Sequence, residues 1–73
     1  MLSEKQMEES GYKAAFRDCY NLLKEYAGRT DENAWEELTE RTITIYKKSP
    51  QIEWFIKSLN CAVLNEIARR QGR

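Results

Sequence analysis

Residues 49–70, SPQIEWFIKSLNCAVLNEIARR, decide the fold of this chain, because their apolar side chains follow helical spacing on two opposite sides. With about 100° between successive residues of an α-helix, one apolar set falls within an arc of roughly 140°. An arc of this width is typical of a helix face that packs against a core. The expected core face consists of Ile52, Phe55, Ile56, Leu59, Ala62, Val63 and Ile67.

A second apolar face lies on the far side of the same helix, separated from the first by polar residues such as Asn60. A small bundle covers only one face of a helix, so the second face predicts contact with another segment, a second copy or a different molecule. Single apolar residues are common on protein surfaces, but Trp54 favours binding because indole is enriched at interface anchor points. The candidate interface consists of Trp54, Lys57, Cys61, Leu64 and Ala68.

The regions before this helix also show helical patterns. Ser3 and Gln6 fit a capping box that would begin a long first helix, but Gly11 would then lie inside that helix at a cost of about 1 kcal/mol. Because Ser10 could instead cap a shorter helix, residues 1–10 are expected to be loose or separately helical. A first main helix is predicted over about 12–27, with Gly28 in the C′ position that ends it. Its apolar positions are Tyr12, Ala15, Phe16, Cys19, Leu22, Leu23 and Tyr26.

A second main helix is predicted over about 31–48, with Thr30 as its N-cap. Residues 41–46, RTITIY, also fit a short strand, because four consecutive residues are β-branched. No other segment could pair with such a strand, which favours the helix. The expected inner face is Trp35, Leu38, Thr42, Ile45 and Tyr46.

Ser49 and Pro50 then predict the start of the third main helix, over about 50–70, with serine as N-cap and proline at the first helical position. The fold class is therefore all-α: one domain over residues 1–73, a small bundle of three main helices with a potential short extra N-terminal helix. A chain of 73 residues buries only about 60% of its unfolded surface, so its core is thin.

The composition excludes several functional classes. The chain has no histidine and only two cysteines, so we expect no enzyme, no metal site and no cofactor. Cys19 and Cys61 are interpreted as small apolar residues. The longest uninterrupted apolar run, residues 61–64, is far too short to span a bilayer, and acidic residues near the N-terminus argue against a signal peptide. We therefore expect no membrane association and a cytoplasmic location.

Twelve basic and twelve acidic residues cancel, but they are unevenly distributed. The basic end, Arg69, Arg70 and Arg73, is a candidate nucleic-acid contact, although cations also commonly complement a helix C-terminus and this bias is weak for a nucleic-acid-binding domain. An acidic strip on the second helix could imitate a phosphate backbone or simply solvate the outer face. Its residues are Asp31, Glu32, Glu36, Glu37 and Glu40.

The leading hypothesis is a non-enzymatic helical protein–protein interaction module that forms a homodimer through the second face of the last helix. An alternative is a small accessory or inhibitor protein, of the kind found in phages and mobile elements, that binds a foreign protein through the Trp54 face or the acidic strip. Such a target could be a nucleic-acid enzyme. A second alternative is weak nucleic-acid binding by the basic end. In a further arrangement, Met1, Leu2 and Met7 fold back over the second face and leave no interface there.

Overall fold

The protein is described over residues 1–72 by a computed structural model, and every regular element in that range is helical. The short helix α1 (Glu4–Ser10) precedes three main helices, α2 (Tyr12–Tyr26), α3 (Glu32–Lys48) and α4 (Glu53–Arg70). A 3₁₀ turn, η1 (Pro50–Ile52), leads directly into α4. The expected all-α bundle of three main helices, with a short additional N-terminal helix, is confirmed.

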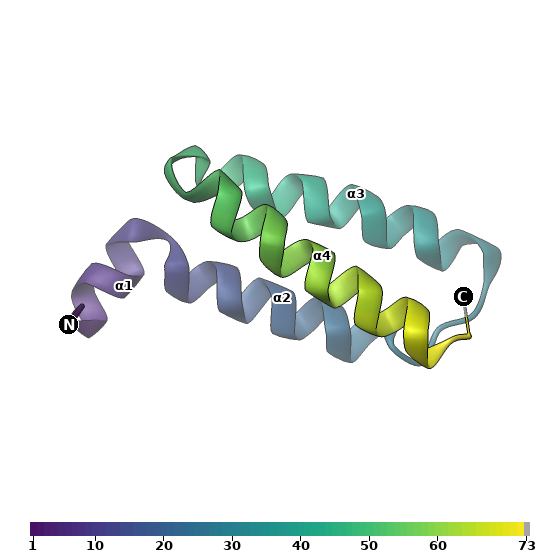
Figure 1. Cartoon of the computed structure of the whole chain (residues 1–73). Coiled ribbons are helices and arrows are strands. Elements are labelled where there is room, and N and C mark those ends of the chain that lie inside the picture. Colours follow the sequence, from purple (N-terminus) through teal and green to yellow (C-terminus); the bar gives the residue numbers. More distant parts are fainter. Residues whose placement is uncertain (73) are drawn as a thin grey trace.

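The three main helices lie side by side (Figure 1). α2 and α4 run in the same direction and α3 runs in the opposite one, while α1 bends away from the start of α2. Each main helix packs against the other two. Because the helices lie side by side, the molecule is elongated along them and measures 39 × 20 × 16 Å. Each helix therefore keeps one face that points away from the core.

α1 is a separate helix because Gly11 ends it. Its start is the expected capping box: the Ser3 backbone N–H donates to Gln6 Oε1 at 2.8 Å, and the Gln6 N–H donates to Ser3 Oγ at 3.1 Å. Gly11 then adopts a left-handed conformation, with φ of 93°, that turns the chain into α2. The Gln51 side chain donates to the carbonyl of Ser10 at 2.9 Å, which ties this corner to η1.

Two details at the junction of α2 and α3 differ from the expectation. Asp31, rather than Thr30, is the N-cap residue of α3, and it has extended backbone angles. Gly28 follows the C-cap residue Ala27 but does not have the positive φ expected of a C′ glycine. Ala27 remains right-handed, so the helix runs into a turn instead of a left-handed stop.

The β-branched segment 41–46 lies inside α3. Threonine hydroxyls in and near it donate to carbonyls of the preceding turn: Thr44 to Glu40 at 3.2 Å and Thr39 to Trp35 at 2.9 Å. These bonds satisfy the hydroxyls without leaving the helix. The neighbouring Ile45 is buried, so tertiary packing outweighs the modest helix penalty of the branched side chains.

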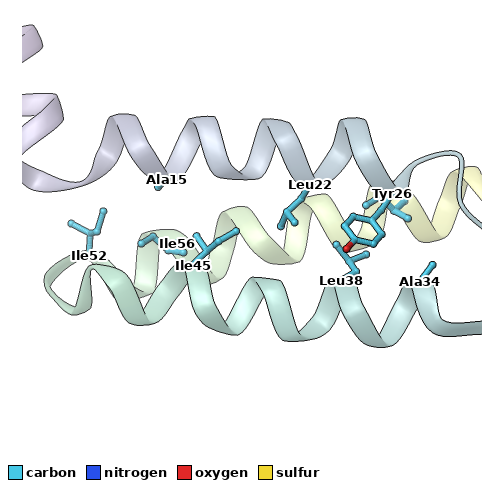
Figure 2. Packing of buried hydrophobic residues seen from close by; sticks show 9 residues of the cluster. Ala15, Leu22, Tyr26, Ala34, Leu38, Ile45, Ile52 and Ile56 are labelled. Carbon is cyan, nitrogen blue, oxygen red and sulfur yellow. The ribbon is translucent and has the colours of Figure 1, made fainter.

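The core receives large side chains from all three main helices (Figure 2). Leu22, Leu38, Ile56 and Ile67 are at most 1% exposed, and burial of a side chain of this size contributes about 1.5–3 kcal/mol. The aromatic rings of Tyr12 and Phe55 close the α1 end of the core with an edge-on contact, centroids 4.9 Å apart.

The core face of α4 is rotated from the one expected. Asn60, expected at a polar boundary, is only 4% exposed, whereas Ala62, expected in the core, is exposed. The Asn60 amide nitrogen donates to the Thr42 carbonyl at 3.0 Å, and the Cys19 thiol donates to Asn60 Oδ1 at 3.5 Å. Because both polar ends find partners, the amide can be buried without a large desolvation penalty.

Candidate interaction surface on the side of α4

The rotation of α4 divides its second apolar face. Trp54 is 84% exposed and Cys61 is exposed, so both point away from the core. Leu64 packs against the core from its edge, and Ala68 is half-buried. The outward face of α4 is therefore narrower than the sequence indicated, and Trp54 is its largest side chain.

Lys57 is held by contacts within the chain. Its ammonium group lies 4.9 Å from the centre of the Tyr46 ring on α3, a cation–π contact. It also lies 3.8 Å from the carboxylate of Glu53, one helical turn earlier. Lys57 thus covers part of the seam between α3 and α4.

Exposed apolar residues of α2 and α3 flank α4, and the sequence interpretation did not include them in the candidate interface. On α2, Phe16 is 50% exposed and Tyr20 is 65% exposed. Phe16 contacts Phe55 of α4 with ring centroids 5.4 Å apart, and Tyr20 lies one helical turn further along the same flank. Residues 16 and 20 are one helical turn apart, so their spacing indicates that both side chains lie on one flank of α2. Phe16 was expected in the core, however, and is half exposed.

Ile43 occupies the corresponding position on α3. It is 37% exposed and lies three residues before Tyr46, whose ring contacts Lys57 of α4. We call the set Phe16, Tyr20, Ile43, Trp54 and Cys61 the α4-side surface. Between its members, the outer side of α4 forms a shallow depression lined by Trp54, Lys57, Ser58, Cys61, Ala62 and Asn65.

On the opposite side of the molecule, ion pairs connect α2 to α3. Lys48 lies 3.6 Å from the carboxylate of Asp18, and Arg41 binds Glu25. Hydrogen bonding to the Tyr26 hydroxyl, followed by that to Glu25, raises the pKa of Arg41. These contacts give the α2–α3 side a charged character that contrasts with the α4-side surface.

The acidic strip is partly neutralised by Arg29. The Arg29 guanidinium lies 2.8 Å from Asp31 and 3.0 Å from Glu37, and its hydrogen bonds lower the pKa of both carboxyl groups. Glu32, Glu36 and Glu40 are exposed on the outer side of α3. The five residues therefore do not present one uniform row of negative charge.

The basic end is also partly paired. Arg69 binds the carboxylate of Glu66 through two nitrogens, with the closer contact at 2.6 Å, and this contact lowers the pKa of Glu66. Arg70 is exposed, and Arg73 lies outside the described residues. Gln71 ties this end of α4 to the loop after α2, because its amide donates to the Tyr26 carbonyl at 3.0 Å and to that of Arg29.

The two cysteines differ in environment. Cys19 is buried, and desolvation raises the pKa of its thiol, whereas Cys61 is exposed on α4. Across residues 1–72, no three His, Cys, Asp or Glu side chains gather where they could hold a metal ion. None of the helices in this range is long and apolar enough to cross a membrane.

The N-terminal residues do not cover Trp54. Met1 and Leu2 are exposed, Met7 is half-buried, and α1 packs mainly against α2. The arrangement in which these residues fold back over the second face is therefore wrong.

Comparison with known proteins finds no family model, no curated protein and no solved structure that matches the chain.

Proposed function

We propose that the protein is a non-enzymatic helical interaction module that self-associates through the outward face of α4, with Trp54 as the central anchor. The observation that carries this proposal is the 84% exposure of Trp54 on a folded bundle. A side chain of this size dominates the energy of an interface when a partner covers it.

The neighbours of Trp54 support the proposal. Tyr20 of α2, Ile43 of α3 and Cys61 of α4 are also exposed, so a partner that covers Trp54 and extends to any of them removes more apolar surface from water. Each square ångström of apolar surface removed from water contributes about 25 cal/mol before the costs of association. The charged α2–α3 side offers no comparable gain, because ion pairs at a surface contribute little.

Self-association is favoured because the domain is small. Its core contains few large side chains, and oligomerisation is one of the common ways in which small domains gain stability. In a two-fold dimer the same surface serves both copies, so one exposed tryptophan supplies two anchors. The two free cysteines agree with the cytoplasmic location that we also propose, since thiols stay reduced there.

Sedimentation equilibrium over a range of protein concentrations tests the proposal. We expect a reversible monomer–dimer equilibrium for the native sequence, and a dissociation constant raised about 30-fold or more in Trp54→Ala, as for an interface hot spot. Glu40→Ala is a matched control, because Glu40 is exposed on the outer side of α3. Its dissociation constant should be unchanged.

A native protein with the mass of one chain at every concentration contradicts self-association. If Trp54 is nevertheless protected from an aqueous quencher only in the presence of a foreign protein, the surface belongs to a different partner. A dissociation constant that changes in Glu40→Ala but not in Trp54→Ala assigns the contact to the acidic strip.

A further inference from the structure

We infer that the N-terminal segment is a conformational switch, in which α1 and α2 exchange between a bent state and a single straight helix over residues 4–26. The structure shows the bent state, with Gly11 between the two helices (Figure 1). In the straight state Gly11 is helical and α1 leaves the corner at η1. The inference is independent of the proposed self-association, because it concerns only contacts within one chain.

α1 depends on surface contacts for its position. None of its residues is buried, and Met7 and Ser10 are half-buried. An exposed hydrogen bond, from the Gln51 side chain to the Ser10 carbonyl, links it to η1. A segment without buried side chains opens at a lower free energy than the core, because little apolar surface meets water when it moves. α1 can therefore move while the three main helices stay packed.

The Ser10 carbonyl has a hydrogen-bond donor in both states. In the bent state it accepts from the Gln51 side chain at 2.9 Å. In a straight helix it accepts instead from the backbone N–H of Ala14, four residues later. The first two N–H groups of α2 likewise gain carbonyl partners in α1, whereas in the bent state α2 begins at Gly11 without a side-chain cap. These backbone bonds offset the unfavourable placement of glycine inside a helix.

Lys13 also has a carboxylate partner in both states. In the bent state its ammonium group lies 3.0 Å from Glu8 and 3.6 Å from Glu4, across the bend. In a straight helix Glu8 is turned away by about 140° and Glu4 lies about 13 Å away along the axis, so both contacts are lost. Glu9 then precedes Lys13 by four residues, the spacing at which a carboxylate and an ammonium group pair on a helix. This exchange of partners keeps the two states close in energy, since surface ion pairs contribute little.

Gly11 determines which state predominates. Its φ of 93° lies in the left-handed region, which glycine adopts at no steric cost. A Cβ atom there would lie 2.6 Å from Ser49 Oγ and 3.4 Å from Ile52 Cδ1. Glycine therefore allows the bent state, and we expect the straight state to be a minor one, at about 1% of the molecules.

The bend joins the N-terminal segment to the corner between α3 and α4. In the straight state Gln51 loses the Ser10 carbonyl, so η1 is released from α1. Gly11 is the hinge, since a single residue at the junction of two helices absorbs the change in backbone angles. A molecule that binds one state more tightly than the other shifts the equilibrium towards that state.

NMR spectroscopy of the full chain tests the switch. Gly11→Ala disfavours the left-handed conformation and favours a helical residue 11, so the ratio of straight to bent molecules should rise about 100-fold, to comparable populations. A continuous helix places the Hα protons of Glu9 and Ser10 close to the amide protons three and four residues later. Gly28→Ala is the control, because Gly28 has no positive φ, and it should leave residues 4–14 as in the native chain.

Gln51→Ala is a second variant that leaves Gly11 unchanged. Gln51 is exposed, and loss of its hydrogen bond to Ser10 should raise the population of the straight state about fivefold. Relaxation dispersion at the amides of residues 8–14 measures this minor population in the native chain and in the variant.

Three results overturn the switch. Gly11→Ala does so if it shows only the native distances between residue 11 and the corner at 49–52. It also does so if residues 4–10 lose their helical distances, because α1 then unfolds instead of joining α2. If Gly11→Ala does not fold, an unchanged minor population in Gln51→Ala overturns the inference. These results are measured within one chain, so they leave the proposed self-association to its own test.

Discussion

Asn60 joins all three main helices through one side chain. Its amide donates to the Thr42 carbonyl of α3 and accepts from the Cys19 thiol of α2, and the residue is only 4% exposed. The net gain from such hydrogen bonds is only about 0.5–1.5 kcal/mol each. An unsatisfied polar group in the same place costs more, so Asn60 favours the one alignment of helices in which its partners are present.

Replacing Asn60 with aspartate tests whether the hydrogen bond from its amide nitrogen to the Thr42 carbonyl stabilises the fold. In Asn60→Asp the carboxylate cannot donate to the Thr42 carbonyl, and it carries a charge into a site that is 4% exposed. We expect the free energy of unfolding at pH 7 to fall by about 3 kcal/mol, measured by urea denaturation.

Asn65→Asp is the matched control for this experiment. Asn65 is exposed on the same helix, so the same chemical change should alter the free energy of unfolding by less than about 0.5 kcal/mol. Equal losses in the two variants would mean that Asn60 is not buried among α2, α3 and α4.

At the scale of elements, the break between α1 and α2 depends on one glycine. Gly11 has φ of 93°, and a Cβ atom built on it would lie 2.6 Å from the Ser49 side-chain oxygen. Any other L-residue therefore meets both backbone strain and a close contact. The break also brings Ser10 within hydrogen-bonding distance of Gln51, which joins the first helix to the corner between α3 and α4.

Gly11→Ala should lower the free energy of unfolding by about 1–2 kcal/mol, because the left-handed conformation is unfavourable for alanine. Gly28→Ala is the comparison: Gly28 has no positive φ, and a Cβ atom there meets nothing within 4 Å. It should be neutral or stabilising by up to about 1 kcal/mol, because alanine restricts the unfolded chain. Thermal unfolding of both variants checks this, and similar effects at the two positions would contradict it.

At the scale of the whole molecule, the bundle has two unlike sides. The α2–α3 side is joined by ion pairs such as Asp18–Lys48, and the α4-side surface exposes Trp54 and its apolar neighbours. This asymmetry arises because α2 places Asp18 and Glu25 on the flank facing α3 and Phe16 against Phe55 of α4. A partner that covers the α4-side surface therefore adds to the stability of the whole fold.

If the native protein dimerises through this surface, its thermal midpoint should increase with protein concentration. By mass action, a hundredfold increase stabilises each chain by about 1.4 kcal/mol, which corresponds to about 9 °C for a domain of this size. Scanning calorimetry or circular dichroism over that range measures the shift. Trp54→Ala should show a smaller shift of its midpoint over the same concentrations, and an equal shift in both proteins would place the contact elsewhere.

Helical spacing along the chain was sufficient to predict the class of fold and the segments that form the three main helices. The pattern of Leu22 and Tyr26 in α2, and that of Leu38 and Ile45 in α3, depends only on the period of the α-helix. The capping box of Ser3 and Gln6 was likewise visible, since a cap is a local hydrogen-bonding motif.

The order of residues is enough to specify which segments are helical and that α4 has more apolar surface than an ordinary surface helix, because both are local properties. The rotation of α4 within the bundle depends instead on contacts with the other helices. Hydrogen-bond partners on α2 and α3 draw Asn60 inward, which moves Leu64 to the edge of the core and leaves Trp54 and Cys61 outside. The physical reason is that burial of a polar group depends on partners distant in the chain, which helical periodicity does not contain.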